Sequence, residues 1–302
     1  MCTVLITGAT GNVGSRVAAD LVAAGVRPRL FVRDATRLMH RWQGGSVEVA
    51  LGDFDDEESV EAAMRGIDRI FLTSADGPDK VAHECAVIAA AKRAGVGRIV
   101  KLSAMHARTG SPLPAFDWHG RIEAVLADSG MPHVLLRPAF FLDNLLMVAP
   151  GVAATGHLAA PTGGARAAMV DVRDVAASAA SAVLANQVLR DSYDLTGPES
   201  VTFAQVADAI ATATKQTIVF DDLTPEEAAP RFAGAGLPSW LGTQLSGAFG
   251  VMRDGGFDAV SDGVRELTGR RARAVSSWAR VHAAAFVSEP APAPPQPSVR
   301  LG

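Results

Sequence analysis

The sequence has few cysteines and no long apolar run, and both absences exclude whole classes of protein. Cys2 and Cys85 are the only cysteines among 302 residues, too few for a disulfide framework or a thiolate metal site. No stretch supplies the ~20 apolar residues of a membrane-spanning helix, because Arg137, Asp143 and several prolines or glycines interrupt the most apolar region, residues 135–160. The first residues form a strand pattern without a basic leader. We therefore expect a cytoplasmic protein that does not engage membranes.

Basic charge is also scarce. The formal net charge is -4, so the chain offers no positive field for nucleic acid. The histidines show no metal-ligand spacing, and we expect no metal. With 48% apolar and 20% charged residues, the chain can bury a large core in one or two domains. These totals do not determine its oligomeric state.

The stretch Thr3–Gly14 is the most informative in the chain. A short β-branched apolar run meets three glycines spaced three residues apart, and an apolar helical period follows. A strand that turns sharply into a helix needs backbone angles open to glycine, and a diphosphate reaches main-chain N–H groups only where no Cβ intervenes. The motif predicts a dinucleotide-binding turn. Its expected cofactor-binding residues are Gly8, Thr10, Gly11, Asn12, Val13 and Gly14.

The residues after the second predicted strand, 29–32, bear on the choice of cofactor. Arg33, with Arg37 one helical turn later, offers forked donors to the 2′-phosphate of NADP. Asp34 could instead hold the 2′-hydroxyl of NAD, and two solvated surface arginines are the plainest alternative. We expect NADP(H).

Small or polar residues also follow the next two predicted strands. Asp53 and Phe54 could bond and stack an adenine, or could be ordinary turn and core residues. Thr73, Ser74 and Ala75 end the fourth strand, where a dinucleotide fold opens its crevice.

Strands and helices alternate from the amino terminus, which predicts an α/β fold with a doubly wound parallel Rossmann sheet. We assign residues 1–198 to this domain, with a crossover segment of about 142–168 leading into a second lobe. A smaller, mainly helical C-terminal lobe covers 199–286, and the proline-rich residues 287–302 form a flexible tail.

One helical face in the second lobe allows two interpretations. Leu237, Leu241, Leu245 and Met252 recur at helical spacing beside Trp240. We favour a core face over a ligand wall.

Several segments in a fixed order resemble the atypical short-chain dehydrogenase/reductases, most closely their NmrA-like branch. They are 7–14, 31–34, 101–103, 135–146, 171–176, 193–198 and 267–270. The resemblance runs from about residue 3 to 286 and implies an NADP(H) site in a Rossmann fold. It implies cofactor contacts from the glycine-rich loop, from Arg33 and from the residues after the fourth and sixth strands. The last two groups are Thr73, Ser74 and Ala75, and Pro138, Ala139, Phe140 and Phe141.

The chain departs from the wider superfamily at the catalytic residues. Reductases of that superfamily carry a Tyr, a Lys four residues later, and a Ser near the end of the fifth strand, which together protonate a carbonyl oxygen. Here the single tyrosine, Tyr193, lies in a late strand. Ala115 falls where the Tyr belongs and His119 where the Lys belongs, while Ser103 keeps the Ser position. The usual proton relay is therefore absent.

Three functions follow from this departure. We favour an NADPH-dependent oxidoreductase that transfers hydride to a small quinone-like or conjugated aromatic acceptor, because such an acceptor spreads the developing charge and needs no positioned acid. The alternatives are a non-enzymatic NADP(H)-binding redox sensor of the NmrA type, and a secondary-metabolite carbonyl or enone reductase with His119 as acid. Candidate catalytic residues are His119 and Ser103, and candidate substrate contacts are Asn144 and Trp118.

Overall fold

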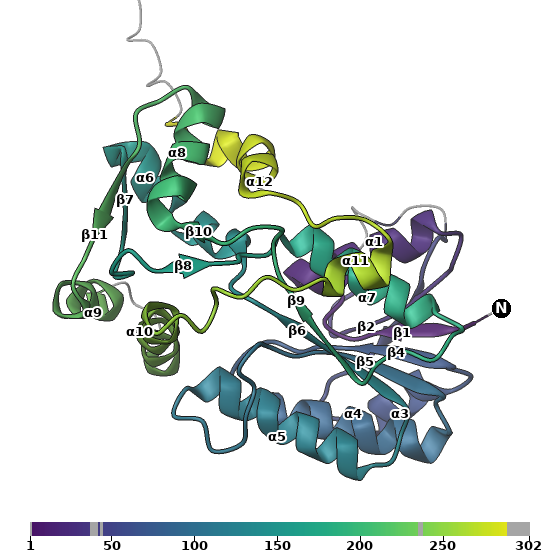
Figure 1. Ribbon diagram of the computed structural model, residues 1–302. Coiled ribbons are helices and arrows are strands. Elements are labelled where there is room, and N and C mark those ends of the chain that lie inside the picture. Colours follow the sequence, from purple (N-terminus) through teal and green to yellow (C-terminus); the bar gives the residue numbers. More distant parts are fainter. Residues whose placement is uncertain (1, 37–41, 43–44, 235–237, 289–302) are drawn as a thin grey trace, which may run out of the picture.

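A computed structural model describes residues 2–36, 42, 45–234 and 238–288. Its largest element is a parallel sheet of seven strands in the order β3-β2-β1-β4-β5-β6-β9 (Figure 1). The strands are β1 (Val4–Ile6), β2 (Arg29–Val32), β3 (Glu48–Leu51), β4 (Arg69–Leu72), β5 (Arg98–Leu102), β6 (His133–Pro138) and β9 (Ser192–Leu195). The sheet confirms the predicted doubly wound Rossmann fold, with its change of strand order between β1 and β4.

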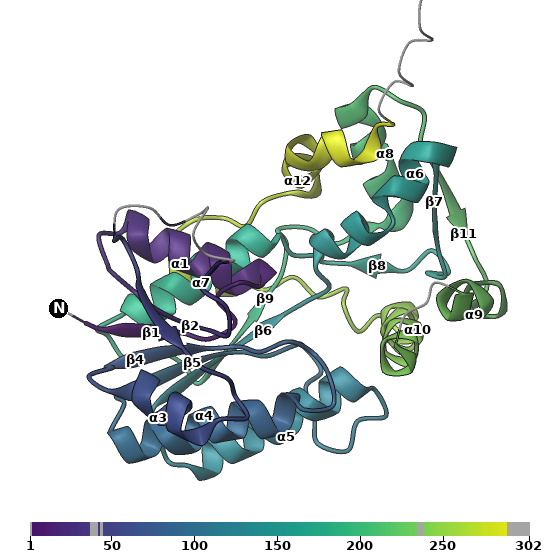
Figure 2. The same ribbon diagram turned by 180° about the vertical axis from the view of Figure 1, so that it is seen from behind.

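Helices cover both faces of the sheet, as Figures 1 and 2 show from opposite sides. One face carries α1 (Asn12–Ala23), α7 (Val172–Leu184) and α11 (Gly263–Thr268), with α7 packed against both of the others. The other carries α3 (Glu57–Met64), α4 (Lys80–Ala94) and α5 (Pro114–Asp128). Each face buries its own apolar core, so the central strands are apolar on both sides, as parallel strands between two helical layers must be.

The second lobe extends beyond the carboxyl ends of the strands. It begins after β6 with η1 (Leu142–Met147), α6 (Ala149–Thr155), β7 (His157–Ala160) and β8 (Arg166–Ala167). It continues with β10 (Val201–Thr202), α8 (Phe203–Thr214), β11 (Val219–Asp222), α9 (Pro225–Gly234), α10 (Ser239–Arg253), α12 (Val275–His282) and η2 (Ala283–Phe286). Strand β11 pairs in parallel with β7, and β10 pairs antiparallel with β8. A third apolar core joins the two chain segments of this lobe around Phe203 and Trp278.

One helix that follows the predicted domain division packs against the domain that precedes it. Helix α11 belongs to the later segment, 199–286, but packs on α7 and β9 of the first domain. A Cβ at Gly263 would lie 2.1 Å from the carbonyl oxygen of Asp194, so glycine is required for this close approach. The division at residue 199 stays a prediction, and most of the tail 287–302 lies outside the described residues.

Within the described part of the chain, none of the helices combines the length and the apolar character needed to cross a membrane. The same residues contain no group of three His, Cys, Asp or Glu side chains arranged to hold a metal ion.

Candidate active site

The turn between β1 and α1 leaves no room for side chains. Gly8 has a φ of +58°, and a Cβ there would lie 2.8 Å from Thr73 Cγ2. A Cβ at Gly14 would lie 2.3 Å from the Gly8 carbonyl oxygen, so α1 starts directly against the turn. The Thr7 hydroxyl donates to the Thr73 carbonyl oxygen over 2.7 Å and fixes β1 to the end of β4. These contacts explain why glycine stands at Gly8 and Gly14.

The amino end of α1 suits a phosphate group. Gly11 occupies the N-cap position and supplies no side-chain cap, and the first turn holds no acidic residue. The first N–H groups of a helix lack intrahelical partners and lie at its positive dipole end. The turn therefore fits the diphosphate of a dinucleotide, which its main-chain N–H groups would bind.

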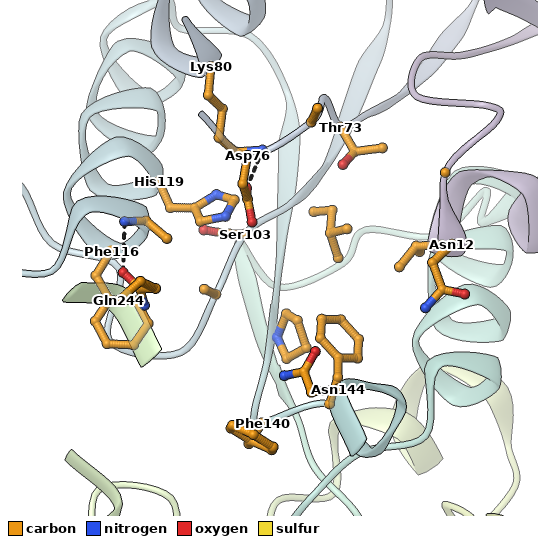
Figure 3. Close-up of a pocket in the computed structure, with 18 of the residues that line it drawn as sticks. Asn12, Thr73, Asp76, Lys80, Ser103, Phe116, His119, Phe140, Asn144 and Gln244 are labelled. Atoms are coloured by element: carbon orange, nitrogen blue, oxygen red, sulfur yellow. Dashed lines mark hydrogen bonds and ion pairs between the residues drawn. The ribbon is translucent and has the colours of Figure 1, made fainter. Parts of the chain in front are cut away.

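A cavity of about 590 Å³ opens from this turn, along the carboxyl ends of the strands, to the second lobe (Figure 3). It brings together most of the predicted site residues: Gly8, Thr10, Gly11, Asn12, Val13, Gly14, Thr73, Ser74, Ala75, Ser103, His119, Pro138, Ala139, Phe140, Phe141 and Asn144. Figure 3 shows Asn12 and Thr73 facing His119 and Gln244 across the open space. Asn144 lies on η1.

Other predicted residues lie away from this cavity. Arg33 is exposed after β2 and has no ion-pair partner among the described residues, and Arg37 lies outside the described residues. Phe54 stacks on His83 with ring centroids 5.2 Å apart, and Asp53 accepts a hydrogen bond from the Asp55 amide. Neither Asp53 nor Phe54 is among the described residues that line the cavity.

Trp118 is half-buried on α5 and is not among the described residues that line the cavity. It packs edge-on against Trp240 of α10, with ring centroids 5.2 Å apart, and Trp240 is the ring that lines the cavity. Trp118 thus lies one side chain away from the space where a substrate would bind.

The wall contributed by α10 overturns the sequence interpretation of that helix. Leu241 and Leu245 line the cavity together with Trp240, Gln244 and Ala248. Met252, further along the helix, is fully buried in the core of the second lobe, and Leu237 lies outside the described residues. Preferring a core face to a ligand wall was therefore wrong for the first half of α10, because helical periodicity identifies an apolar face but not what that face covers.

His119 occupies the inner side of the cavity and is 6% exposed. Its Nδ1 lies 3.2 Å from the ammonium nitrogen of Lys101, which is fully buried on β5. Burial, with added repulsion from Lys101 and Lys80, lowers the pKa of His119 well below its usual value. The imidazole is therefore neutral at physiological pH.

A buried cluster of charges lies behind His119. Glu84, on α4, forms ion pairs with both lysines, with Oε2 2.8 Å from Lys101 Nζ and Oε1 3.0 Å from Lys80 Nζ. Lys80 also pairs with Asp76 at the cavity wall over 3.2 Å. Burial alone would raise the pKa of Glu84, but the two ammonium groups hold it below its ordinary value, so Glu84 is ionised. Burial lowers the pKa of Lys101 to about 8.

The hydroxyl proton of Ser103 is already used in a hydrogen bond. It donates to Glu123 Oε1 over 2.6 Å, and Glu123 in turn accepts two hydrogen bonds from Arg137, at 2.9 and 2.6 Å. A hydroxyl has one proton. Ser103 therefore lines the cavity as a hydrogen-bond acceptor in this arrangement.

The expected Tyr and Lys positions also lie at the cavity. Ala115 and His119, on α5, both line it. Tyr193 is buried in β9. Its hydroxyl accepts a hydrogen bond from the Arg190 amide over 3.1 Å. Arg190 precedes β9, so this hydroxyl lies far from the carboxyl ends of the strands, where the cavity opens. No described tyrosine reaches the cavity.

Sequence reasoning missed Lys80, Glu84 and Lys101. A signal was present for one of them: the chain has four lysines against 24 arginines, and Lys101 interrupts an apolar strand between Val100 and Leu102. A lysine in a strand buried on both faces needs a partner.

The comparisons with known proteins agree with this site. The model of an NAD(P)H-binding family matches residues 8–187. The chain is 32% identical over 283 residues to an NAD(P)H azoreductase of Xenophilus azovorans, covering 94% of this chain and 99% of the relative. It is 35% identical over 287 residues to a (4-alkanoyl-5-oxo-2,5-dihydrofuran-3-yl)methyl phosphate reductase of Streptomyces griseus, covering 95% and 100%.

A solved structure has the same fold. The NADPH-dependent quinone oxidoreductase QOR2 of Escherichia coli, in complex with NADPH, superposes with a TM-score of 0.83 at 27% identity, covering 91% of this chain and 98% of that one. Together with the glycine turn and the seven-stranded sheet, these matches establish the family. The chain belongs to the NAD(P)H-binding family and is an NAD(P)H-dependent oxidoreductase of the atypical short-chain dehydrogenase/reductase type.

Proposed function

We propose that this protein is an NADPH-dependent reductase of small, flat, conjugated acceptors such as quinones, azo dyes or ring enones. The observation that carries the proposal is the continuity of the cavity, which runs from the glycine turn to a wall of apolar side chains. The reduced cofactor, when bound at the turn, supplies a hydride. The protein supplies closeness and orientation.

The outer part of the cavity favours an apolar aromatic ring. The side chains that line it are apolar: Met105, Phe116, Phe140, Trp240, Leu241, Leu245 and Phe257. Flat aromatic walls bind flat conjugated ligands by stacking and edge contacts. Asn144, beside this wall, offers an amide that can orient either the acceptor or the nicotinamide carboxamide.

The apolar aromatic wall favours flat conjugated acceptors over small aliphatic ketones. A conjugated acceptor also spreads the charge that hydride transfer creates over its ring, so it depends less on a strong acid than a ketone, whose alkoxide must be protonated. The printed names of three similar proteins are consistent with this choice: an azoreductase, a quinone oxidoreductase, and a reductase of a dihydrofuran bearing oxo and alkanoyl groups. The preference for NADPH rests on Arg33.

The test is NADPH oxidation with a quinone, an azo dye, a ring enone and, as the contrasting acceptor, an aliphatic ketone. We expect turnover with the conjugated acceptors and little with the ketone. Tight NADPH binding with no turnover on any acceptor would instead favour a redox sensor, and efficient ketone reduction would refute the acceptor class.

A pair of variants locates the acceptor site. Ala248→Trp fills the outer cavity, so acceptor turnover should fall while NADPH binding persists. Ala229→Trp places the same ring on the exposed surface of α9 and should change neither. Equal turnover in the two variants would mean that the acceptor binds elsewhere.

A further inference from the structure

The inference concerns the source of the proton that the acceptor needs, and it rests on the proposed function. An ammonium group has three N–H donors and no acceptor. Lys101 Nζ has three acceptors within reach: the carbonyl oxygen of Leu102, Oε2 of Glu84 at 2.8 Å and Nδ1 of His119 at 3.2 Å. Three groups that can accept a proton therefore surround its three donors.

The tautomer of His119 follows from this count. Because Lys101 can only donate, Nδ1 of His119 must carry a lone pair, and the proton of the neutral ring must lie on Nε2. No described residue accepts a hydrogen bond from Nε2, and His119 lines the cavity. Figure 3 shows the ring projecting from α5 beside Ser103 and toward Asp76.

We propose that His119 is the acid that protonates the reduced acceptor and that Lys101 is the positioning residue that fixes its tautomer and replaces its proton. The acceptor takes a hydride at one atom and the Nε2 proton at its neighbour, for instance at the second nitrogen of an azo group. At the same time Nδ1 takes a proton from Lys101, so the ring stays neutral. Lys101 regains a proton from water after the product leaves, and one proton is consumed per acceptor.

The surroundings hold Lys101 ready for this step. The charged groups clustered with Lys101 are Glu84 and Lys80 on α4 and Asp76 in the preceding loop. His119 faces Lys101 from α5. Lys80 uses its own three donors on Glu84, Asp76 and the Ser74 carbonyl oxygen. Ionised Glu84 balances one of the two lysines, and the buried position makes the Lys101 proton easier to lose than that of a lysine in water.

The first experiment uses three acceptors in the same active site. Reduction of an azo dye requires a proton at the neighbouring nitrogen. Reduction of a quinone depends less on a proton from the protein, and a cationic triphenylmethane dye takes hydride without any proton. General acids contribute roughly 10²- to 10⁴-fold. We expect Lys101→Met to slow azo reduction by about 10²-fold or more and dye reduction by less than about 2-fold, with the quinone between them.

Two further variants separate chemistry from folding. His119→Gln keeps an acceptor for Lys101 and an N–H toward the cavity but cannot pass a proton, so it should show the same graded loss while the charge cluster stays intact. Lys92→Met removes an exposed lysine on α4 and should change nothing. Equal losses on the azo dye and the cationic dye would show that Lys101 and His119 are merely structural.

The pH dependence gives a second criterion. Lys101 is protonated below a pKa of about 8 and neutral above it, so kcat for the azo dye should fall as the pH rises through about 8. This alkaline decline should be absent with the cationic dye and in His119→Gln. A decline that persists in both would overturn the relay.

A measurement on the unliganded protein keeps this inference separate from the proposed function. The ¹⁵N shifts of the His119 ring should show a neutral ring with its proton on Nε2 at pH 7. This result is expected even if the acceptor class is wrong. A proton on Nδ1, or a charged ring at pH 7, would refute the relay whatever the protein reduces.

Discussion

At the scale of single residues, we propose that the choice of NADPH over NADH depends on one exposed side chain. Arg33 follows β2 directly, where a dinucleotide fold meets the adenosine ribose, and its guanidinium is solvent-accessible. A hydrogen bond to a charged group contributes about 1.5–3 kcal/mol. We expect Arg33→Ala to weaken NADPH binding roughly 10- to 150-fold, by calorimetry, and to leave NADH binding almost unchanged.

A matched variant checks that general charge is not responsible. Arg280→Ala removes an exposed arginine on α12 and should leave both cofactors bound as before. If Arg33→Ala weakens NADPH and NADH equally, the 2′-phosphate lies elsewhere.

Residues differ in how visible they are from the sequence. Gly8 and Gly14 could be predicted because a positive φ and a 2.3 Å approach tolerate no other residue. His119 could be placed by its distance from the end of its helix. Glu84 could not, because it stands at an ordinary helix position. Lys101 interrupts an apolar strand, but that signal does not identify its partners, which meet it only when α4, β5 and α5 come together.

At the scale of elements, the buried charge cluster joins α4 to β5 and α5. Glu84 is fully buried and forms ion pairs with both Lys80 and Lys101. Removing one partner of a buried ion pair leaves an uncompensated charge, at a cost of about 3–5 kcal/mol. We expect Glu84→Gln to lower the free energy of unfolding by that amount in denaturant titrations.

An exposed glutamate provides the comparison. Glu61→Gln breaks an ion pair with Arg93 whose two side chains are both about half exposed, and such pairs contribute about 0–1 kcal/mol. Similar losses in the two variants would mean that the buried cluster adds nothing beyond a surface pair.

Helix α5, which carries His119, also depends on a glycine. A Cβ at Gly120 would lie 2.2 Å from the Arg108 carbonyl carbon and 2.3 Å from the Thr109 nitrogen, so the loop before α5 passes directly over the helix. Gly→Ala inside an open helix stabilises by about 1 kcal/mol. Gly120→Ala should instead destabilise by about 1–3 kcal/mol in thermal or denaturant unfolding, as overpacked sites do.

A second glycine provides the control with the opposite sign. A Cβ at Gly242, inside α10, would have no atom within 4 Å, so Gly242→Ala should be neutral or stabilising. A stabilising Gly120→Ala would show that the loop at Arg108 moves aside easily.

The limits of sequence prediction for elements appear in α5 as well. The sequence predicts a helix over residues 118–128, ending at Ser129 and Gly130. In the structure α5 begins earlier, at Pro114, a residue whose fixed φ suits the first helical turn. Strands β2 and β9 could be placed correctly because turn residues bound short apolar runs. Gly120 made the start of α5 hard to predict. Glycine is required there because the loop at Arg108 and Thr109 packs against the helix, and a local sequence pattern does not show such a tertiary contact.

At the scale of the whole molecule, the candidate active site forms where the Rossmann domain meets the second lobe. The Rossmann domain supplies the glycine turn, Ser103 and His119, and α10 of the second lobe supplies the opposite wall. The sequence predicts both lobes, but the amphipathic pattern of α10 could not reveal that its apolar face closes a cavity. In the proposed function, substrate choice therefore depends on the wall that the sequence predicts least well.

Trp240 is the largest side chain of that wall, and it packs against Trp118 on the opposing helix. An aromatic contact contributes about 0.5–1.5 kcal/mol beyond buried area. We expect Trp240→Ala to raise KM for an aromatic acceptor roughly 2- to 12-fold, in steady-state assays, while the Kd for NADPH stays the same. Trp240→Phe should restore most of the loss, and Val281→Ala, on an exposed face of α12, should have no effect. A change in NADPH affinity without a change in KM would mean that α10 covers the cofactor and that the acceptor approaches from another side.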